Sequence, residues 1–433
     1  MDSSLSDESI TIVPQELSAQ EETGMPAQPS TPKSLGFQVL YGLANAIIGI
    51  GNITFYTLLL PARISTLAPA DQTNTFILLS GIGALAATLT NPLVGALSDR
   101  TTSPLGRRLP WLLVGMILLL VSMLTLAYAS SLIMLGIGAI VLQIAINCLL
   151  AALSALIPDQ IPLSQRATVS AFGGMAPLVG GLIGQILVGQ VLKDITASFL
   201  VLAQISIVLL LLFILVLREE RLSKGALAPF GLKDIPRSLW LNPRTYPDFA
   251  RTWLARCCVF LAATTVVNYM FYFLQTEHVF PVEQVATGVQ IFYSIYVLSL
   301  LLSSLICGRL SDRWQRRKIF VIGSSLTMTV ALLLLAFFPI WSVILVATVI
   351  LGVGFGGYLS VDLALASQLL PRERDHGKDF GLMNAAIFLP MLVIPLIASI
   401  TLSALHSYLL LFIVLAVATT VAALLIRPIT LVK

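Results

Sequence analysis

Two charged residues of this sequence stand out because their surroundings are apolar. Asp362 is the only acid that lies well inside one of the long apolar segments of the chain, and Arg256 is the only base that does so. An ionised side chain at the centre of a bilayer costs about 2.5–3.5 kcal/mol on insertion scales, so it usually faces a partner or a water-filled cavity. The two residues are predicted to lie at similar depth, which makes Arg256 the natural partner of Asp362.

A carboxylate held in this way could carry out proton chemistry. One hypothesis is that Asp362 takes up and releases a proton, or helps to bind a cation, while Arg256 adjusts the affinity of the carboxylate for that proton. The alternative is a permanent ion pair that only fixes the packing of two helices. The sequence leaves both interpretations open.

Uncharged polar residues form a second candidate site, because they recur at helical spacing inside the apolar segments. Amide and hydroxyl groups beside aromatic rings suit a sugar, which has both hydroxyl groups and apolar C–H faces. The same groups can instead join helix to helix by hydrogen bonds. The residues predicted to line a substrate cavity are Tyr41, Asn45, Asn52, Tyr56, Gln143, Asn147, Thr264, Asn268, Tyr272 and Tyr293.

The composition indicates which elements position these side chains. Hydrophobic residues make up 57% of the 433 residues and charged residues 11%, whereas a soluble domain has about 25% charged residues. Helices are expected, because lipid offers no hydrogen-bond partner to an open backbone and about 20 helical residues cross the hydrocarbon core. We predict an all-α membrane protein whose twelve transmembrane helices span residues 37–60, 74–97, 109–129, 131–157, 168–191, 197–217, 251–274, 285–308, 318–338, 341–370, 380–402 and 406–426.

Metal and enzyme chemistry are disfavoured by the residues that would carry them. The four cysteines lie inside apolar segments without a Cys-x-x-Cys motif, so neither a disulfide framework nor a zinc site is indicated. The three histidines are scattered, and no Gly-x-x-x-x-Gly-Lys-Ser/Thr loop or His-Glu-x-x-His motif occurs. We therefore expect no metal, no cofactor, no nucleic-acid partner and no enzymatic activity.

One short segment occurs twice, about half a chain apart. Gly95-Ala-Leu-Ser-Asp-Arg100 returns as Gly308-Arg-Leu-Ser-Asp-Arg313, and each copy ends an apolar segment and is followed by further basic residues. This repetition indicates an internally duplicated chain, which in a membrane protein is typical of a transporter built from two pseudo-symmetric halves. We therefore expect two six-helix bundles.

The distribution of positive charge predicts the orientation. If the N-terminal segment is inside and the spans alternate, all but three of the 25 lysines and arginines lie on the inner side. The exceptions are Arg63 and Lys193 on the outer side and Arg256 within a span. Cytoplasmic loops carry such an excess of positive charge. We expect a multi-pass protein of the plasma (inner) membrane with both termini in the cytoplasm.

The predicted domain organisation follows from the same pattern. Residues 1–36 are polar and form a retained, disordered cytoplasmic tail rather than a signal peptide. Residues 37–217 form the first bundle, 218–250 a charged, proline-containing cytoplasmic linker, 251–427 the second bundle and 428–433 a short cytoplasmic tail.

Twelve spans in two halves, with Gly-x-Leu-x-Asp-Arg and following arginines after spans 2 and 8, resemble the major facilitator superfamily. The longer first copy, residues 98–111, is similar to the sucrose transporters and the glycoside–pentoside–hexuronide:cation symporters. The resemblance implies that Asp99 engages the start of span 11 and Asp312 the start of span 5. The alternative is that the bases only fix topology. The residues expected to latch the cytoplasmic gate are Gly95, Asp99, Arg100, Gly106, Arg107, Arg108, Gly308, Asp312, Arg313, Arg316 and Arg317.

The function predicted from these features is secondary active transport by alternating access, with proton-coupled uptake of a sugar or glycoside. The rival is a proton-coupled efflux antiporter for drugs or metabolites, because Ala176-Pro-Leu-Val-Gly-Gly181 resembles a Gly-Pro-x-x-Gly-Gly motif of such antiporters. The expected partners are a small-molecule substrate, a proton and the lipid bilayer, and the protein is expected to act as a monomer.

Overall fold

The computed structural model of the protein describes residues 32–191, 194–217, 219, 246–281, 284–314, 316–369 and 376–429. Most of the predicted N-terminal tail, nearly all of the predicted linker and the last four residues therefore lie outside the described part of the chain. Side chains of most residues between 363 and 385 also lie outside it, as does that of Asp312.

Helices occupy all the predicted spans, with boundaries that differ from the prediction by a few residues. The first half contains α2 (Leu35–Ile48), η1 (Gly49–Ile53), η2 (Phe55–Leu59), α3 (Leu60–Leu67), α4 (Gln72–Asp99), α5 (Leu109–Ala127), α6 (Leu132–Gln160), α7 (Leu163–Ile186), η3 (Leu187–Val191) and α8 (Ile195–Val216). The second half contains α10 (Pro247–Thr276), α11 (Val285–Trp314), α12 (Arg317–Phe337), α13 (Trp341–Leu369), α14 (His376–Ala398), η5 (Ser399–Ala404) and α15 (Tyr408–Ile426).

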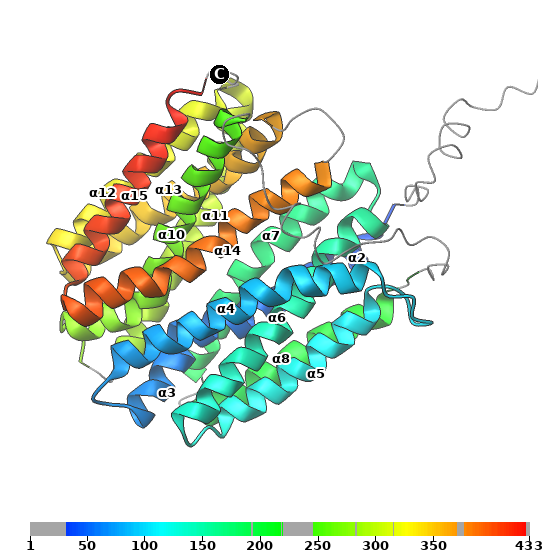
Figure 1. Ribbon diagram of the computed structural model, residues 1–433, viewed down its shortest axis with the longest axis horizontal. Coiled ribbons are helices and arrows are strands. Elements are labelled where there is room, and N and C mark those ends of the chain that lie inside the picture. The colour runs from blue at the N-terminus through cyan, green and yellow to red at the C-terminus, as the bar shows by residue number, and fades with distance from the viewer. Residues whose placement is uncertain are drawn as a thin grey trace, which may run out of the picture.

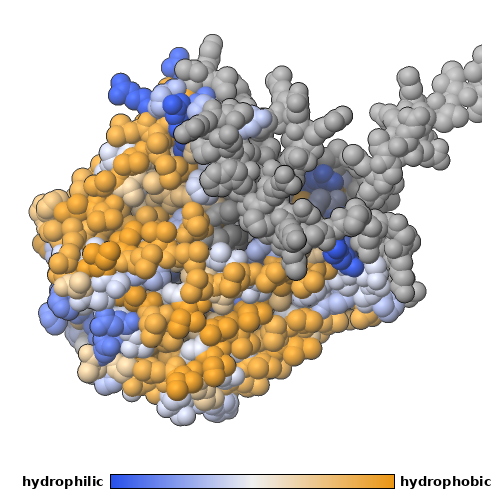
Figure 2. All heavy atoms as spheres, viewed as in Figure 1, coloured by the Kyte–Doolittle hydropathy of each residue, from blue (hydrophilic) through white to orange (hydrophobic). Residues whose placement is uncertain are grey.

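Eleven of these helical segments are long and apolar enough to cross a membrane, counted over the described residues. The remaining predicted span corresponds to α14 and η5, which contain Pro390 and Pro395; within its described side chains the apolar stretch is Leu389–Ala404. Figure 2 shows that hydrophobic residues cover most of the visible face, whereas hydrophilic residues gather near the helix ends. The all-α membrane architecture predicted from the sequence is confirmed.

The helices form two bundles that meet along a few helices (Figure 1). α4 of the first bundle packs against α14 of the second, and α7 packs against α11. Most other contacts lie within one bundle, for example those of α5 with α6 and of α12 with α13. This arrangement lets each half behave as a unit while four helices provide the main seam between the halves.

The backbones of span 1 and α7 approach each other closely. A Cβ added at Gly49 would lie 1.7 Å from the carbonyl oxygen of Pro177, and a Cβ added at Gly180 would lie 2.0 Å from the carbonyl oxygen of Ala46. Small residues in membrane helices permit such close packing. The wider π-helical turns η1 and η2 begin at this crossing, and no feature of the sequence predicted them.

Replacement of Gly180 by Ala tests the importance of this crossing. The new methyl group would collide with backbone, which side-chain rotation cannot relieve, and such overpacking typically costs about 1–3 kcal/mol. We expect Gly180→Ala to lower the melting temperature of the detergent-purified protein. Gly174→Ala on the same helix is the matched control, because its Cβ would meet nothing within 4 Å. An equal melting temperature for both variants would contradict the packing argument.

Candidate functional site

Arg256 and Asp362 form a buried ion pair. The fold brings Arg256 on α10 and Asp362 on α13 together, and Nη1 of the guanidinium donates to Oδ2 of the carboxylate. Only 5% of Arg256 and 2% of Asp362 is exposed. Nε of Arg256 and Oδ1 of Asp362 have no hydrogen-bond partner among the described residues. The pair is therefore predicted correctly as a contact, while its role in proton coupling stays a prediction.

Aromatic rings surround this ion pair and continue away from it. The guanidinium of Arg256 lies 5.3 Å from the ring centroid of Phe260, which packs edge-on against Phe355 at 5.4 Å. Phe355 stacks on Tyr296 at 6.4 Å, and Tyr296 contacts Tyr293 at 6.3 Å. A guanidinium over an aromatic face gains a favourable cation–π interaction, which partly offsets its loss of water.

Tyr293 carries this aromatic series to the first bundle. Its hydroxyl lies 3.5 Å from the carbonyl oxygen of Leu178 on α7, towards which it donates. It also lies 2.8 Å from the position that a Cβ at Gly181 would occupy. Tyr293 is thus a contact between the two halves, in addition to being a predicted cavity residue.

Gln143 gathers several predicted cavity residues of the first bundle. Its Nε2 donates to Oδ1 of Asn52 at 3.1 Å and to the hydroxyl of Tyr56 at 2.8 Å. Nearby, Asn147 accepts a hydrogen bond from Asn91 at 3.1 Å. These amides therefore join span 1, α4 and α6, as the helix-packing alternative expects, and a substrate would have to compete for them.

The other predicted cavity residues have different surroundings. Tyr41 donates to the carbonyl oxygen of Leu153, and Asn45 donates to the carbonyl oxygen of Tyr41 on its own helix. Thr264 and Asn268 are half-buried on α10, and no hydrogen bond of theirs occurs within the described part of the chain.

An aromatic cluster closes the seam where α4 begins, which we call the Phe76 end of the molecule. Phe76 on α4 packs against Tyr269 and Tyr272 on α10, with ring centroids 5.2 Å and 5.1 Å apart. Tyr272, predicted as a cavity residue, is 1% exposed and belongs to this contact between the halves. One turn and more further along α4, a Cβ at Gly81 would lie 3.3 Å from Pro395 of α14.

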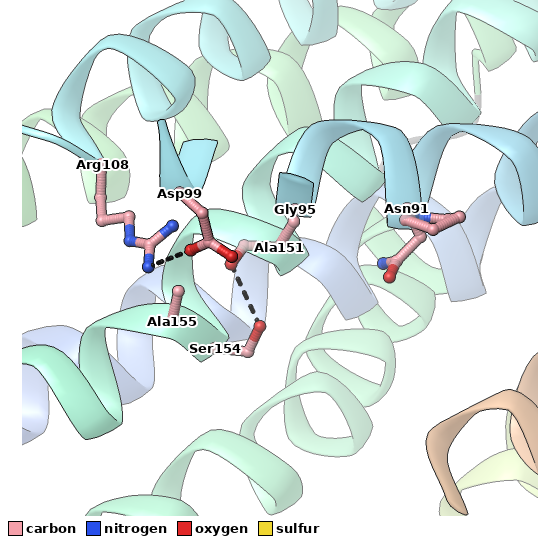
Figure 3. Close-up of a pocket in the computed structure, with 8 residues that line it drawn as sticks. Asn91, Gly95, Asp99, Arg108, Ala151, Ser154 and Ala155 are labelled. Carbon is pink, nitrogen blue, oxygen red and sulfur yellow. Dashed lines mark hydrogen bonds and ion pairs between the residues drawn. The ribbon is translucent and has the colours of Figure 1, made fainter. Parts of the chain in front are cut away.

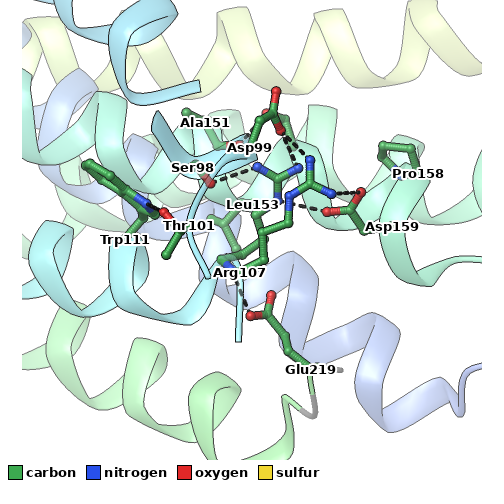
Figure 4. Close-up of polar contacts among 12 residues, drawn as sticks. Ser98, Asp99, Thr101, Arg107, Trp111, Ala151, Leu153, Pro158, Asp159 and Glu219 are labelled. Atoms are coloured by element: carbon green, nitrogen blue, oxygen red, sulfur yellow. Dashed lines mark hydrogen bonds and ion pairs between the residues drawn. The ribbon is translucent and has the colours of Figure 1, made fainter. Parts of the chain in front are cut away.

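The first copy of the repeated motif forms a charge network where α4 ends, which we call the Asp99 end (Figure 4). Oδ1 of Asp99 accepts from Arg107 at 2.8 Å and lies 2.7 Å from Nη2 of Arg108. Arg108 also donates to Asp159 at 2.8 Å and to Ser98 at 2.8 Å. Arg108 is only 3% exposed, so this network ties α4, α5 and α6 into one unit.

A pocket of about 290 Å³ lies beside this network, between α4 and α6. Figure 3 shows Asp99 and Arg108 at one end of the pocket and Asn91 towards the other. A Cβ at Gly95 would meet nothing within 4 Å, and the Asp99 side chain is 57% exposed. The contact between Asp99 and the start of span 11 that the resemblance implies is not described here, because the side chains there lie outside the described residues.

The second copy of the motif is only partly described. Gly308 packs next to Ser360, whose Cβ would lie 3.6 Å from a Cβ at Gly308. Arg313 and Arg316 are exposed, and the side chain of Asp312 is outside the described residues. The predicted contact between Asp312 and the start of span 5 therefore stays a prediction.

Glu219 is a functional candidate that the sequence did not reveal. Its Oε2 accepts from the backbone amides of Arg108 and Leu109, at 2.8 Å and 3.0 Å, and so caps the first turn of α5. A carboxylate at a helix N-terminus satisfies free amides and suits the helix dipole. Gly106 has a φ of +110° and makes room for this carboxylate, since a Cβ there would lie 2.3 Å from it.

Two helical bundles with a buried ion pair in one and a repeated charged segment at their ends define a membrane transporter of two pseudo-symmetric halves. The sequence profile of the Major Facilitator Superfamily matches residues 41–291 and 285–432, and the chain therefore belongs to this superfamily. It is a multi-pass transporter rather than an enzyme. No curated protein matches the chain in sequence.

A solved structure has the same fold. It is the crystal structure of a bacterial homolog to human lysosomal transporter, Spinster, in an inward-facing and unoccupied conformation. The TM-score is 0.62 at 14% sequence identity, over 91% of this chain and 95% of that chain. At this identity the similarity concerns the fold alone.

Removal of the Glu219 cap should loosen the loop that carries the charge network. Loss of a helix N-cap costs about 0.5–2 kcal/mol, so we expect Glu219→Ala to lower the melting temperature of the purified protein. Glu219→Gln keeps an acceptor oxygen and is expected to recover most of the loss. Wild-type stability in Glu219→Ala would show that the two amides find other partners.

Proposed function

We propose that this transporter takes up a sugar or glycoside together with a proton, by alternating access, as a monomer in the plasma membrane with both termini in the cytoplasm. The buried pair of Arg256 and Asp362 carries the proposal. A carboxylate at this depth is costly, and intramembrane acids usually mark proton or ion pathways. The unpartnered Oδ1 of Asp362 gives a proton a free oxygen to bind without first breaking the contact between Oδ2 and Arg256.

The two ends of the seam support alternating access. At the Phe76 end, Phe76, Tyr269 and Tyr272 pack across the halves. At the Asp99 end, Gly95 faces open space and a pocket adjoins the exposed Asp99. With the orientation expected from the positive charges, this is a state open towards the cytoplasm. In the opposite state, the start of α14 would fill the pocket and engage Asp99, as expected of the latch.

The polar residues near the seam support a polar, hydroxyl-bearing substrate. Thr264 and Asn268 on α10 are half-buried without a described side-chain hydrogen bond, and the Tyr293 hydroxyl lies at the limit of a hydrogen bond to Leu178. Alternating hydroxyl and amide groups with aromatic rings are what a sugar site requires. The membership of the narrower sugar-symporter branch rests on the motif at residues 98–111 alone.

Efflux of drugs or metabolites is the second candidate, and its support is the segment from Ala176 to Gly181. In the structure Pro177 and Gly181 border span 1, where Gly49 lies against the Pro177 carbonyl. Close helix packing is thus sufficient reason for these small residues. A thermal-shift screen of sugars and lipophilic cations separates the two candidates, because stabilisation by the cations alone would favour efflux.

Asp362→Asn tests proton coupling. Asparagine resembles the protonated carboxyl but cannot release a proton, so we expect loss of pH-gradient-driven accumulation in liposomes, down to the level seen without a gradient. Exchange of labelled for unlabelled substrate should persist, since it needs no net proton movement. Asp71→Asn, at an exposed helix start, is the control. Accumulation at wild-type level in Asp362→Asn would remove the proposed role of this residue.

Gly95→Leu tests the latch. The described state has room for a side chain at Gly95, so thermal stability is expected to stay close to that of the wild type. The leucine would block the approach of α14, and we expect transport to fall at least about tenfold, corresponding to a shift of 1.4 kcal/mol or more between the two states. Gly323→Leu on α12, which also has nothing within 4 Å, is the control. Full transport by Gly95→Leu would exclude closure at this position.

A further inference from the structure

The buried pair of Arg256 and Asp362 is electrically neutral only while the carboxylate is ionised. Both side chains are almost fully enclosed, and the guanidinium makes one described hydrogen bond to the carboxylate. Its Nε is enclosed as well and has no partner among the described residues. The guanidinium therefore has unused donor capacity in a place that water does not reach freely.

The other groups near the pair do not replace the charge of Asp362. From α10, Cys257 lies nearby, and from α13, Tyr358 interacts with the carboxylate from one helical turn away. α11 and α12 also pack on α13. On α11, Cys307 is half-buried, Arg309 and Arg313 are exposed, and the side chain of Asp312 lies outside the described residues, so no described group of this helix supplies an anion. On α12 the charged residues are Arg317 and Lys318 at its first turn, and both are bases.

Protonation of Asp362 would consequently leave Arg256 as a buried charge without a described counter-charge. Breaking a buried ion pair from one side is strongly destabilising, because the remaining charge stays out of water. A ligand that brings its own negative charge removes this penalty. The planar guanidinium fork matches a carboxylate or a phosphate group and can bind either through two hydrogen bonds.

We propose that the substrate carries an anionic group, a carboxylate or a phosphate, which Arg256 binds when Asp362 is protonated. This inference rests on the proposed function, because it uses the same pair and adds the chemical class of the cargo. Proton and anion then enter the site together, and with a singly charged anion, a carboxylate or a phosphate monoanion, the site stays neutral in both states. By linkage, each ligand raises the affinity for the other by the same factor. An uncharged solute gains nothing from Arg256 in this way.

A binding screen on the full-length purified protein tests the inference without any flux measurement. The probes are four acids, each with an uncharged counterpart of similar size: gluconate and sorbitol, lactate and lactamide, benzoate and benzamide, glycerol 3-phosphate and glycerol. Thermal shifts are measured at pH 5.5 and 7.5. We expect at least one acid to stabilise the protein, more strongly at pH 5.5, and its counterpart to have no comparable effect. The carboxylates and the phosphate distinguish the two anion chemistries.

Titration of the strongest acid by calorimetry then gives the coupling. In the pH range where Asp362 titrates, the affinity should rise about tenfold for each unit of pH decrease, with uptake of one proton per anion bound. In Asp362→Asn the affinity should be independent of pH and no proton should be taken up. Arg256→Gln should lose about tenfold to a hundredfold in affinity, and Arg256→Lys should retain part of it.

Three results would overturn the inference. They are equal stabilisation by acids and their uncharged counterparts, absence of stabilisation by every acid at pH 5.5, and unchanged acid affinity in Arg256→Gln. Should Arg256→Gln fail to fold, the pH profile of Asp362→Asn decides alone. Proton-driven uptake of an uncharged sugar would contradict this inference and leave the proposed proton coupling intact. Proton-linked anion binding without any flux would support this inference and contradict the proposed transport.

Discussion

The cost of burying charge is the constraint on which this structure depends. In a chain with 11% charged residues, most of the charges within the described residues lie at helix ends or in loops, where water or other charges can satisfy them. In this part of the chain Arg256 and Asp362 depart from that pattern, and each is tolerated within a helix because of the other. Such a site has few stable states, because a change in the charge of one partner must be compensated by a proton, a bound ligand or a movement of the helices. In a transporter this restriction makes the free energy of the site depend on whether the ligand is bound.

The packing of the molecule is dense within each half, and fewer contacts join the two halves. The backbones of span 1 and α7 touch at Gly49 and Gly180, and Arg108 binds three helix ends in the first bundle. Across the seam the described contacts include aromatic packing at Phe76, van der Waals contact at Gly81 and the hydroxyl of Tyr293 near the carbonyl oxygen of Leu178. Aromatic and van der Waals contacts can separate without leaving an unpaired charge. The halves can therefore part at one end at modest cost while each bundle keeps its internal packing.

The sequence predicted those features that the membrane itself dictates. Spans follow from hydropathy, and the meeting of Arg256 with Asp362 follows from the cost of an unpaired charge at that depth. The internal repeat predicted the two halves, and the superfamily profile supports that reading. Features that depend on how helices approach each other could not be predicted. Glu219 caps α5 only because the end of α8 reaches it, more than 100 residues away in sequence. The polar stripe of span 1 shared a helical face, yet nothing in its spacing indicated that Gln143 would satisfy two of its members.

The aromatic series that starts at Phe260 links the buried ion pair to the contact between the two halves. Phe260, Phe355, Tyr296 and Tyr293 form a short column of stiff rings between the guanidinium of Arg256 and the backbone of α7. Aromatic side chains in a packed interior have few alternative rotamers. A displacement of the first ring is therefore passed on to the next ring rather than absorbed by a side-chain rotation. A shift of the Arg256 guanidinium on ligand binding would then be transmitted through these rings to the contact between the two halves.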